Sequence, residues 1–141
     1  MDIHLAYTSV AAVGFQEDEL TRILEHSRTH NASVGITGVL LYVRGSFIQV
    51  LEGKRAAVEA LYECIKNDPR HINVNLLLNR PIVQRLFSNW AMGYTILTEH
   101  ESYETQAILT NYNEGSAVRQ GNNIVFKMLR IFYETNRRHL D

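Results

Sequence analysis

The sequence has few of the features that mark disulfide-stabilised or membrane-spanning proteins. Cys64 is the single cysteine in 141 residues, which excludes an internal disulfide framework and a metal site built from several cysteines. A lone cysteine is by default a small buried apolar side chain, and it fits a reducing compartment. No apolar run approaches the length of a membrane-spanning helix, which is about 18 residues or more. The N-terminus lacks the pattern of a signal peptide. We therefore expect a cytoplasmic protein that does not enter a membrane.

The sequence also lacks an excess of positive charge. It contains 14 Lys and Arg against 15 Asp and Glu, whereas nucleic-acid binders usually carry a basic surplus because phosphate neutralisation dominates their affinity. A nucleic-acid partner is therefore not expected. The apolar fraction of 45% and the charged fraction of 21% are ordinary for a globular protein, so disorder is excluded for most of the chain.

Signatures of catalysis and of metal binding are missing as well. His26 and His30 form the only histidine pair at helical i, i+4 spacing, and they lack the carboxylate of a His-Glu-x-x-His motif. No nucleophile elbow, paired-carboxylate signature or Walker loop occurs. We expect neither a metal site nor an enzyme.

The apolar pattern predicts an alternation of strands and helices over the first two thirds of the chain. Strands are predicted over residues 3–9, 36–43, 46–52, 71–79 and 90–97, and helices over 16–30 and 54–67. The order β-α-β-β-α-β-β predicts a ferredoxin-like α+β fold in which two helices cover one face of a sheet, with a cleft between them. The run Leu76-Leu77-Leu78 indicates that strand 71–79 is buried on both faces.

The last third is predicted to be helical, over residues 103–111 and 122–137. Ile124, Met128, Ile131 and Phe132 form a stripe that must be buried, either on the helix-free face of the sheet or against a partner. We therefore divide the chain into a domain over residues 1–97 and a C-terminal helical extension over 98–141.

Two polar side chains are conspicuous in the predicted core. Tyr7 and Gln49 lie in the middle of two strands that are central and adjacent in this fold. If both face the helices, a phenol and a carboxamide are buried side by side and each needs a hydrogen-bond partner. The alternative is that Gln49 faces solvent and Tyr7 is an ordinary core tyrosine. Asn31 is similarly open, because asparagine often ends helices but its amide can also bind the imide edge of a ring.

Several motifs, in order and at the expected spacing, resemble the BLUF family of blue-light photoreceptors, which use FAD as chromophore. They are Tyr7-Thr8-Ser9, His30-Asn31, residues 35–42, Phe47-Ile48-Gln49-Val50-Leu51-Glu52-Gly53, Asp68-Pro69-Arg70-His71 and Phe87-Ser88-Asn89-Trp90-Ala91-Met92. The resemblance covers about residues 3–97. The short helical tail is similar to that of the stand-alone, PixD-like type.

The resemblance implies roles for individual residues. Tyr7 donates an electron and then a proton to the excited flavin, Gln49 bridges that phenol and the flavin N5/O4 edge, and Asn31 bonds the N3–H and O4 side. Further residues sandwich the ring or line the pocket and its mouth: Ile23, Ile65, Ser27, His30, Asp68, Arg70 and His71. The last five of these can also be explained as polar residues at helix ends. Trp90 and Met92 match the pair that transmits the signal.

The expected function is therefore a blue-light photoreceptor that binds FAD non-covalently, with FMN or riboflavin as possible substitutes. Light reverses the Gln49 amide, by rotation or tautomerisation, and shifts the absorption slightly to the red. The signal passes to oligomeric state, since a homo-oligomer is expected, or to a separate response protein. The alternatives are a ferredoxin-like ligand-binding or oligomerisation module without photochemistry and a flavin-dependent redox enzyme, for which a second nucleotide motif is missing.

Overall fold

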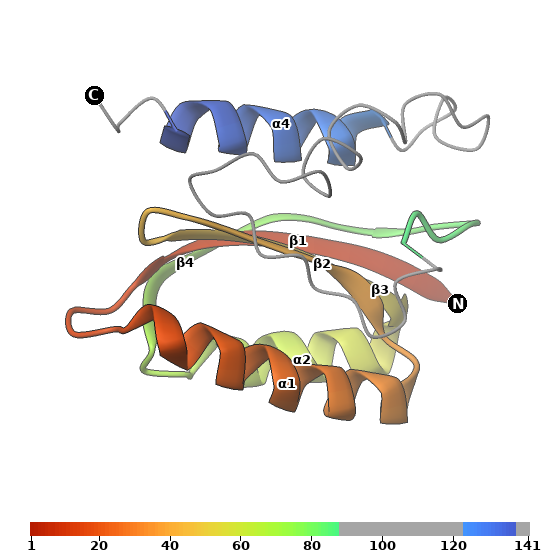
Figure 1. Ribbon diagram of the computed structural model, residues 1–141. Helices are drawn as coiled ribbons and strands as arrows, with labels where there is room; N and C mark the ends of the chain where they lie inside the picture. The colour runs from red at the N-terminus through yellow and green to blue at the C-terminus, as the bar shows by residue number, and fades with distance from the viewer. Residues whose placement is uncertain (88–122, 138–141) are drawn as a thin grey trace.

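In the part of the chain that the structure describes, the central sheet has four strands. The computed structural model describes residues 1–87 and 123–137 (Figure 1). Within them the strand order is β2-β3-β1-β4, and every pairing is antiparallel. The strands are β1 (Asp2–Ala11), β2 (Thr37–Val43), β3 (Ser46–Lys54) and β4 (His71–Pro81). The helices are α1 (Glu17–Val34), α2 (Arg55–Lys66) and α4 (Asn123–Arg137).

Figure 1 shows three layers, with α1 and α2 under one face of the sheet and α4 across the other. This arrangement confirms the predicted ferredoxin-like α+β fold. The predicted strand over 90–97, the helix over 103–111, and both Trp90 and Met92 lie outside the described residues.

Two turns with left-handed backbone explain where the first elements end. Arg44 (φ 48°) and Gly45 (φ 83°) form the two-residue link between β2 and β3, as the twist of a hairpin requires. Helix α1 continues to Val34 and ends at Gly35, whose φ of 71° is left-handed and whose N–H bonds the carbonyl of Asn31. The predicted end near residue 30 was therefore too early, and Asn31 lies inside the helix rather than terminating it.

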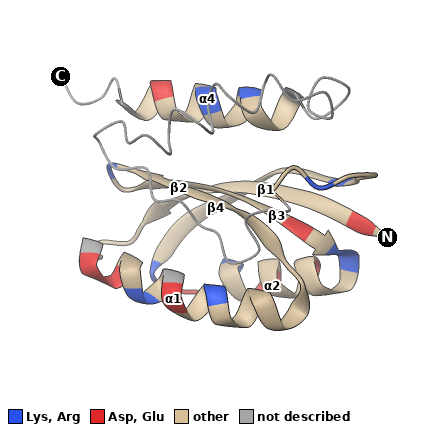
Figure 2. Ribbon diagram, turned by 45° about the vertical axis from the view of Figure 1, so that its right-hand side comes forward, with Lys and Arg blue, Asp and Glu red and all other residues tan. Residues whose placement is uncertain are grey.

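Each face of the sheet has its own apolar core. Toward α1 and α2 the buried side chains are Ile3, Leu5, Tyr7, Leu20, Ile36, Leu40, Tyr42, Phe47, Leu51 and Val58. On the opposite face Val39, Leu41, Ile48 and Val50 pack with Leu86, Phe87 and the α4 residues Val125, Phe126, Leu129, Phe132 and Tyr133. Figure 2 shows charged residues on the helices and near the strand ends, which leaves the middles of β2 and β3 without charged residues.

Two predictions of burial were wrong. Leu76 and Leu77 of β4 are 49% and 45% exposed, because among the described residues β4 pairs only with β1, so it is an edge strand. In α4, Phe132 is buried as predicted, but Ile124 and Ile131 face outward. The helix does cover the face of the sheet that α1 and α2 leave open. Within the described residues, the helices are too short or too polar to cross a membrane.

Candidate functional site

A cavity of about 330 Å³ lies between the helical layer and the sheet. Small-molecule sites are usually about 300–1,000 Å³, so this one suits a compact ring system. Every residue predicted to contact the cofactor lines it: Tyr7, Ile23, Ser27, His30, Asn31, Gln49, Ile65, Asp68, Arg70 and His71. The structure therefore brings together side chains from β1, β3, both helices and the turn before β4.

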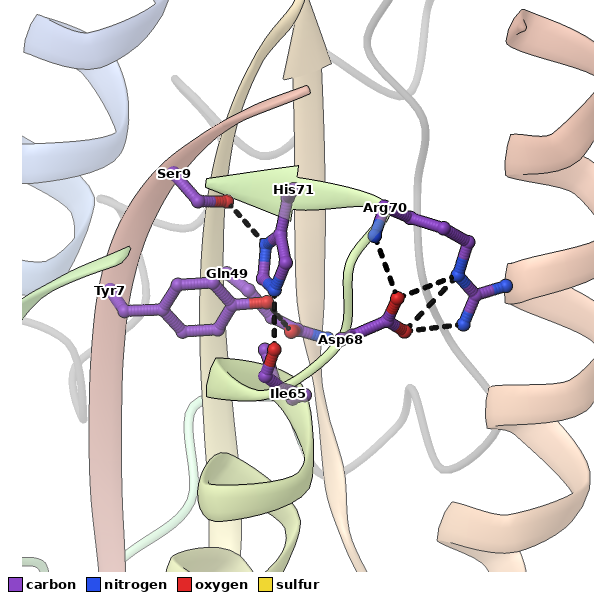
Figure 3. Close-up of polar contacts among 7 residues, drawn as sticks. All are labelled: Tyr7, Ser9, Gln49, Ile65, Asp68, Arg70 and His71. Carbon is purple, nitrogen blue, oxygen red and sulfur yellow. Dashed lines mark hydrogen bonds and ion pairs between the residues drawn. The ribbon is translucent and has the colours of Figure 1, made fainter. Parts of the chain in front are cut away.

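The floor of the cavity is the polar pair predicted from the strand pattern. Tyr7 of β1 and Gln49 of β3 are directly opposed in the antiparallel register, and they are only 4% and 5% exposed. The Tyr7 hydroxyl donates a hydrogen bond to Gln49 Oε1 at 2.5 Å (Figure 3). The alternative in which Gln49 faces solvent is therefore excluded. Because Oε1 is the atom that meets the phenol, the Nε2 group at the other end of the amide points away from it.

Aromatic rings surround the Tyr7 phenol. The ring of Tyr62 on α2 is 5.7 Å from it, centroid to centroid, and the His71 imidazole lies edge-on at 6.2 Å. Such neighbours keep bulk water from the Tyr7–Gln49 hydrogen bond, and a low local dielectric strengthens its electrostatics. The pair is thus a desolvated, fixed donor and acceptor rather than a surface contact.

The hydrogen bonds of His71 show where its ring carries a proton. Its Nε2 contacts the carbonyl oxygen of Ile65, at the end of α2, and its Nδ1 lies 2.9 Å from Ser9 Oγ on β1 (Figure 3). A carbonyl can only accept, so Nε2 carries a proton and donates it to Ile65. Through these two contacts the His71 ring links α2 to the sheet beside Tyr7.

The α1 wall of the cavity follows from helical spacing. Ile23, Ser27 and Asn31 are four residues apart and so share one face of the helix. Asn31, the last of the three along the helix, is buried. On the facing helix, Ile65 lines the opposite wall. Two apolar walls that end in an amide match a flat ring with one polar edge.

An ion pair lies at the mouth of the cavity. Arg70 Nη2 is 2.5 Å from Asp68 Oδ2, and Arg70 Nε and the Arg70 backbone N–H both bond Asp68 Oδ1. The hydrogen bond from the Arg70 guanidinium is the main cause that lowers the pKa of the Asp68 carboxyl. Because both side chains are partly exposed, the pair contributes little to stability, and its effect is to orient the two groups.

Sequence analysis missed further residues of the lining: Phe15, His26, Leu40, Phe47, Leu61 and Cys64. His26 precedes Ser27 and is four residues from His30, a spacing that we interpreted only in terms of metal binding. Cys64 is exposed, contrary to the default of a buried cysteine, although it lies on α2 and lines the cavity. Among the described residues there is no group of three His, Cys, Asp or Glu that could hold a metal ion.

Comparisons of this chain with known families, proteins and structures all point to one family. The family model BLUF, sensors of blue-light using FAD, matches residues 3–93. Photoactivated adenylate cyclase subunit beta of Euglena gracilis is 38% identical over 89 residues, which are 62% of this chain and 10% of that protein. The chain thus spans about a tenth of the length of the curated relatives it matches.

Two solved structures are similar over nearly the whole chain. BlrB, a BLUF protein in its dark state, has a TM-score of 0.69 and 28% identity, with 95% of this chain and 96% of that chain covered. Klebsiella pneumoniae BlrP1 with FMN and cyclic diGMP has a TM-score of 0.79 and 27% identity, with 99% and 36% covered.

Proposed function

This chain belongs to the BLUF family of blue-light sensors that use FAD, and from that premise we propose that FAD binds in the cavity and that light acts on the Tyr7–Gln49 hydrogen bond at its floor. The family is one of flavin-binding photosensors, and its module senses rather than catalyses. The observation that carries the proposal is the buried 2.5 Å contact between Tyr7 Oη and Gln49 Oε1 inside a cavity lined by every predicted cofactor contact.

The chemistry of the lining fits a flavin. The ring system has two apolar faces and a polar edge rich in carbonyl and N–H groups, and we propose that Ile23 and Ile65 contact the faces while Asn31 and Gln49 bind the edge. Residues at the mouth, namely Ser27, His30, Asp68, Arg70 and His71, contact the remainder. A volume of about 330 Å³ suits the ring better than a whole dinucleotide. Recognition therefore falls on the ring, and FMN or riboflavin can replace FAD, which the similar BlrP1 structure with FMN supports.

When bound, the flavin supplies a chromophore that absorbs blue light and, once excited, accepts an electron. Tyr7 is the proposed donor, and its hydroxyl proton already lies in a short hydrogen bond to Gln49 Oε1. Gln49 carries an acceptor at one end of its amide and a donor at the other. Reversing the amide, by rotation or tautomerisation, presents the donor to Tyr7 Oη and changes the hydrogen bond at the ring edge. The electron and the proton return to Tyr7, so there is no net redox change, and a small red shift of the absorption remains.

The output of the sensor is proposed to be a change in association. The signal would pass through Trp90 and Met92 to the C-terminal helices and alter either a homo-oligomer or the binding of a separate response protein. Only a difference in free energy between the dark and lit forms can move such an equilibrium. The presence of BLUF modules in proteins named photoactivated adenylate cyclases supports a role as a transferable light sensor.

The test is an absorption spectrum of the FAD-loaded protein in the dark and after blue light. We expect a red shift that recovers in darkness and that both Tyr7→Phe and Gln49→Leu abolish. Tyr62→Phe and Gln16→Leu are matched controls, because they make the same chemical changes beside the floor and on the surface, and they should keep the shift.

A protein that stays colourless with FAD is a plain binding module. One that NAD(P)H bleaches in the dark is a redox enzyme, and a shift that survives Tyr7→Phe contradicts the proposed mechanism.

A further inference from the structure

A carboxyl group is completely buried on the face of the sheet that is opposite the cavity. Glu52 of β3 is 0% exposed, and its two oxygens accept hydrogen bonds from consecutive backbone N–H groups, those of Leu86 at 2.7 Å and Phe87 at 2.8 Å. Burial raises the pKa of this carboxyl, while the two N–H donors act to lower it. Burying a carboxyl is costly unless it is hydrogen-bonded, so a purely packing role would be served better by an apolar residue.

The segment that Glu52 holds, residues 85–87, lies after β4 and outside any helix or strand. It is nevertheless attached to several strands. Arg85 Nε forms a 2.8 Å ion pair with Asp2 of β1, and Arg85 Nη1 lies 3.4 Å from Thr37 Oγ1 of β2. With Glu52 of β3, three strands therefore fix these three residues. We call this set of contacts the Glu52 clamp.

The Glu52 clamp connects the strand of Gln49 to helix α4. Gln49 and Glu52 lie three residues apart on β3 and so face opposite sides of the sheet. Phe87 is fully buried, and its ring packs 5.7 Å from that of Phe126 on α4. A continuous set of contacts thus runs from the floor of the cavity, along β3, through the carboxyl group of Glu52 to Phe87 and α4.

We propose that Glu52 is a positioning residue of the light response, which couples the strand of Gln49 to residues 86–87 and, through Phe87, to α4; this rests on the proposed function, in which light acts on Gln49. Two N–H···O bonds to one carboxyl group are directional. A displacement of β3 that accompanies the reversal of the Gln49 amide changes the geometry of both bonds together. The lit form therefore holds residues 86–87 less tightly than the dark form, and the contact of Phe87 with α4 changes with them.

The test is amide hydrogen exchange of Leu86 and Phe87, resolved by NMR in the FAD-loaded full chain, in darkness and under continuous blue light. In the native protein we expect faster exchange at both amides in the light. Glu52→Gln leaves only one oxygen for two N–H groups, so exchange in the dark should rise about 10- to 100-fold. In this variant the difference between dark and light should disappear, while the flavin red shift remains. Glu63→Gln, the same change at an exposed position of α2, should behave like the native protein.

Each result decides a different point. Exchange at Leu86 and Phe87 that light does not change in the native protein, although the red shift is present, would overturn the role of Glu52 and leave the proposed function intact. If light still changes exchange at these two amides in Glu52→Gln as much as in the native protein, the role of Glu52 is also overturned. A Glu52→Gln protein without a red shift would place Glu52 among the residues that shape the cavity, against this proposal. If that variant fails to bind FAD, the native comparison alone decides. A native protein without a red shift would overturn both proposals.

Discussion

Acid should destabilise this protein through the protonation of His4. His4 lies on β1 and is 0% exposed, and its Nε2 accepts a hydrogen bond from Arg80 Nε at 3.4 Å. Burial, with a smaller contribution from the Arg80 charge, lowers the pKa of His4 from 6.5 to about 4. The folded protein therefore keeps this imidazole neutral in a pH range where the unfolded chain binds a proton. Stability is fully present above pH 6.5 and is lost as the pH falls toward 4.

The magnitude follows from the size of the pKa difference. The gap between 6.5 and about 4 corresponds to about 3 kcal/mol, at about 1.4 kcal/mol per pKa unit. About 1 kcal/mol of this is lost between about pH 7 and about pH 5.5, and about 2.5 kcal/mol by about pH 4.5. Against a total stability of about 5–15 kcal/mol, this is a large fraction.

The assay is urea unfolding of the FAD-loaded protein, followed by far-UV circular dichroism at these pH values. Glu52, which pairs with His4 across β1 and β3, has a raised pKa and so shifts stability in the opposite direction as the pH falls. The comparison must therefore be between the native protein and His4→Gln, whose amide oxygen can still accept from Arg80. We expect the variant to lose about 2.5 kcal/mol less by about pH 4.5. Equal acid sensitivity of His4→Gln and the native protein would refute the argument.

Two further substitutions test the packing and the backbone. Phe87→Ala removes a fully buried ring that packs on Phe126, and it should reduce the free energy of unfolding in urea by about 3–5 kcal/mol; a loss below about 1 kcal/mol would show that this ring is not part of the core. Gly35→Ala places a Cβ at a φ of 71°, where space is open but the backbone is strained, so the same assay should show a loss of about 1 kcal/mol. An unchanged stability would mean that α1 can end elsewhere.

The sequence predicts best what strand periodicity controls. Alternation along β1 and β3 allows Tyr7 and Gln49 to share a face, and the predicted topology makes these strands neighbours. The buried pair was therefore one of the two alternatives that the pattern left open. Alternation does not say which strand has a neighbour on only one side, and for that reason Leu76 was expected to be buried. Whether a strand lies at the edge depends on how all the strands of the sheet are arranged, and the local sequence pattern does not give that arrangement.

The miss in α4 has a different cause. The run from Ile124 to Tyr133 is apolar on more than one face, so two overlapping stripes satisfy helical spacing, and the face that packs is the one with Val125 and Leu129. Several residues of the cavity lining were not predicted, for a related reason. Phe15 precedes α1 and belongs to no periodic element, and Phe47 follows the alternation of β3 but carries no polar atom that would single it out. Glu52 stood out only as part of a motif, because its partners lie 34 and 35 residues away in the chain.

The ion pair at the mouth of the cavity bears on how the proposed cofactor, an anionic dinucleotide, would reach it. Arg70 is not a bare cation, because the Asp68 carboxylate contacts it directly. The two together form a dipole, whose attraction falls off with distance faster than that of a single charge. An approaching phosphate group is therefore not drawn in from afar by this residue, and the rate of loading should depend only weakly on salt. Under the proposed function, tight binding would then have to come from slow release, which the apolar side chains and the amides of Asn31 and Gln49 would set.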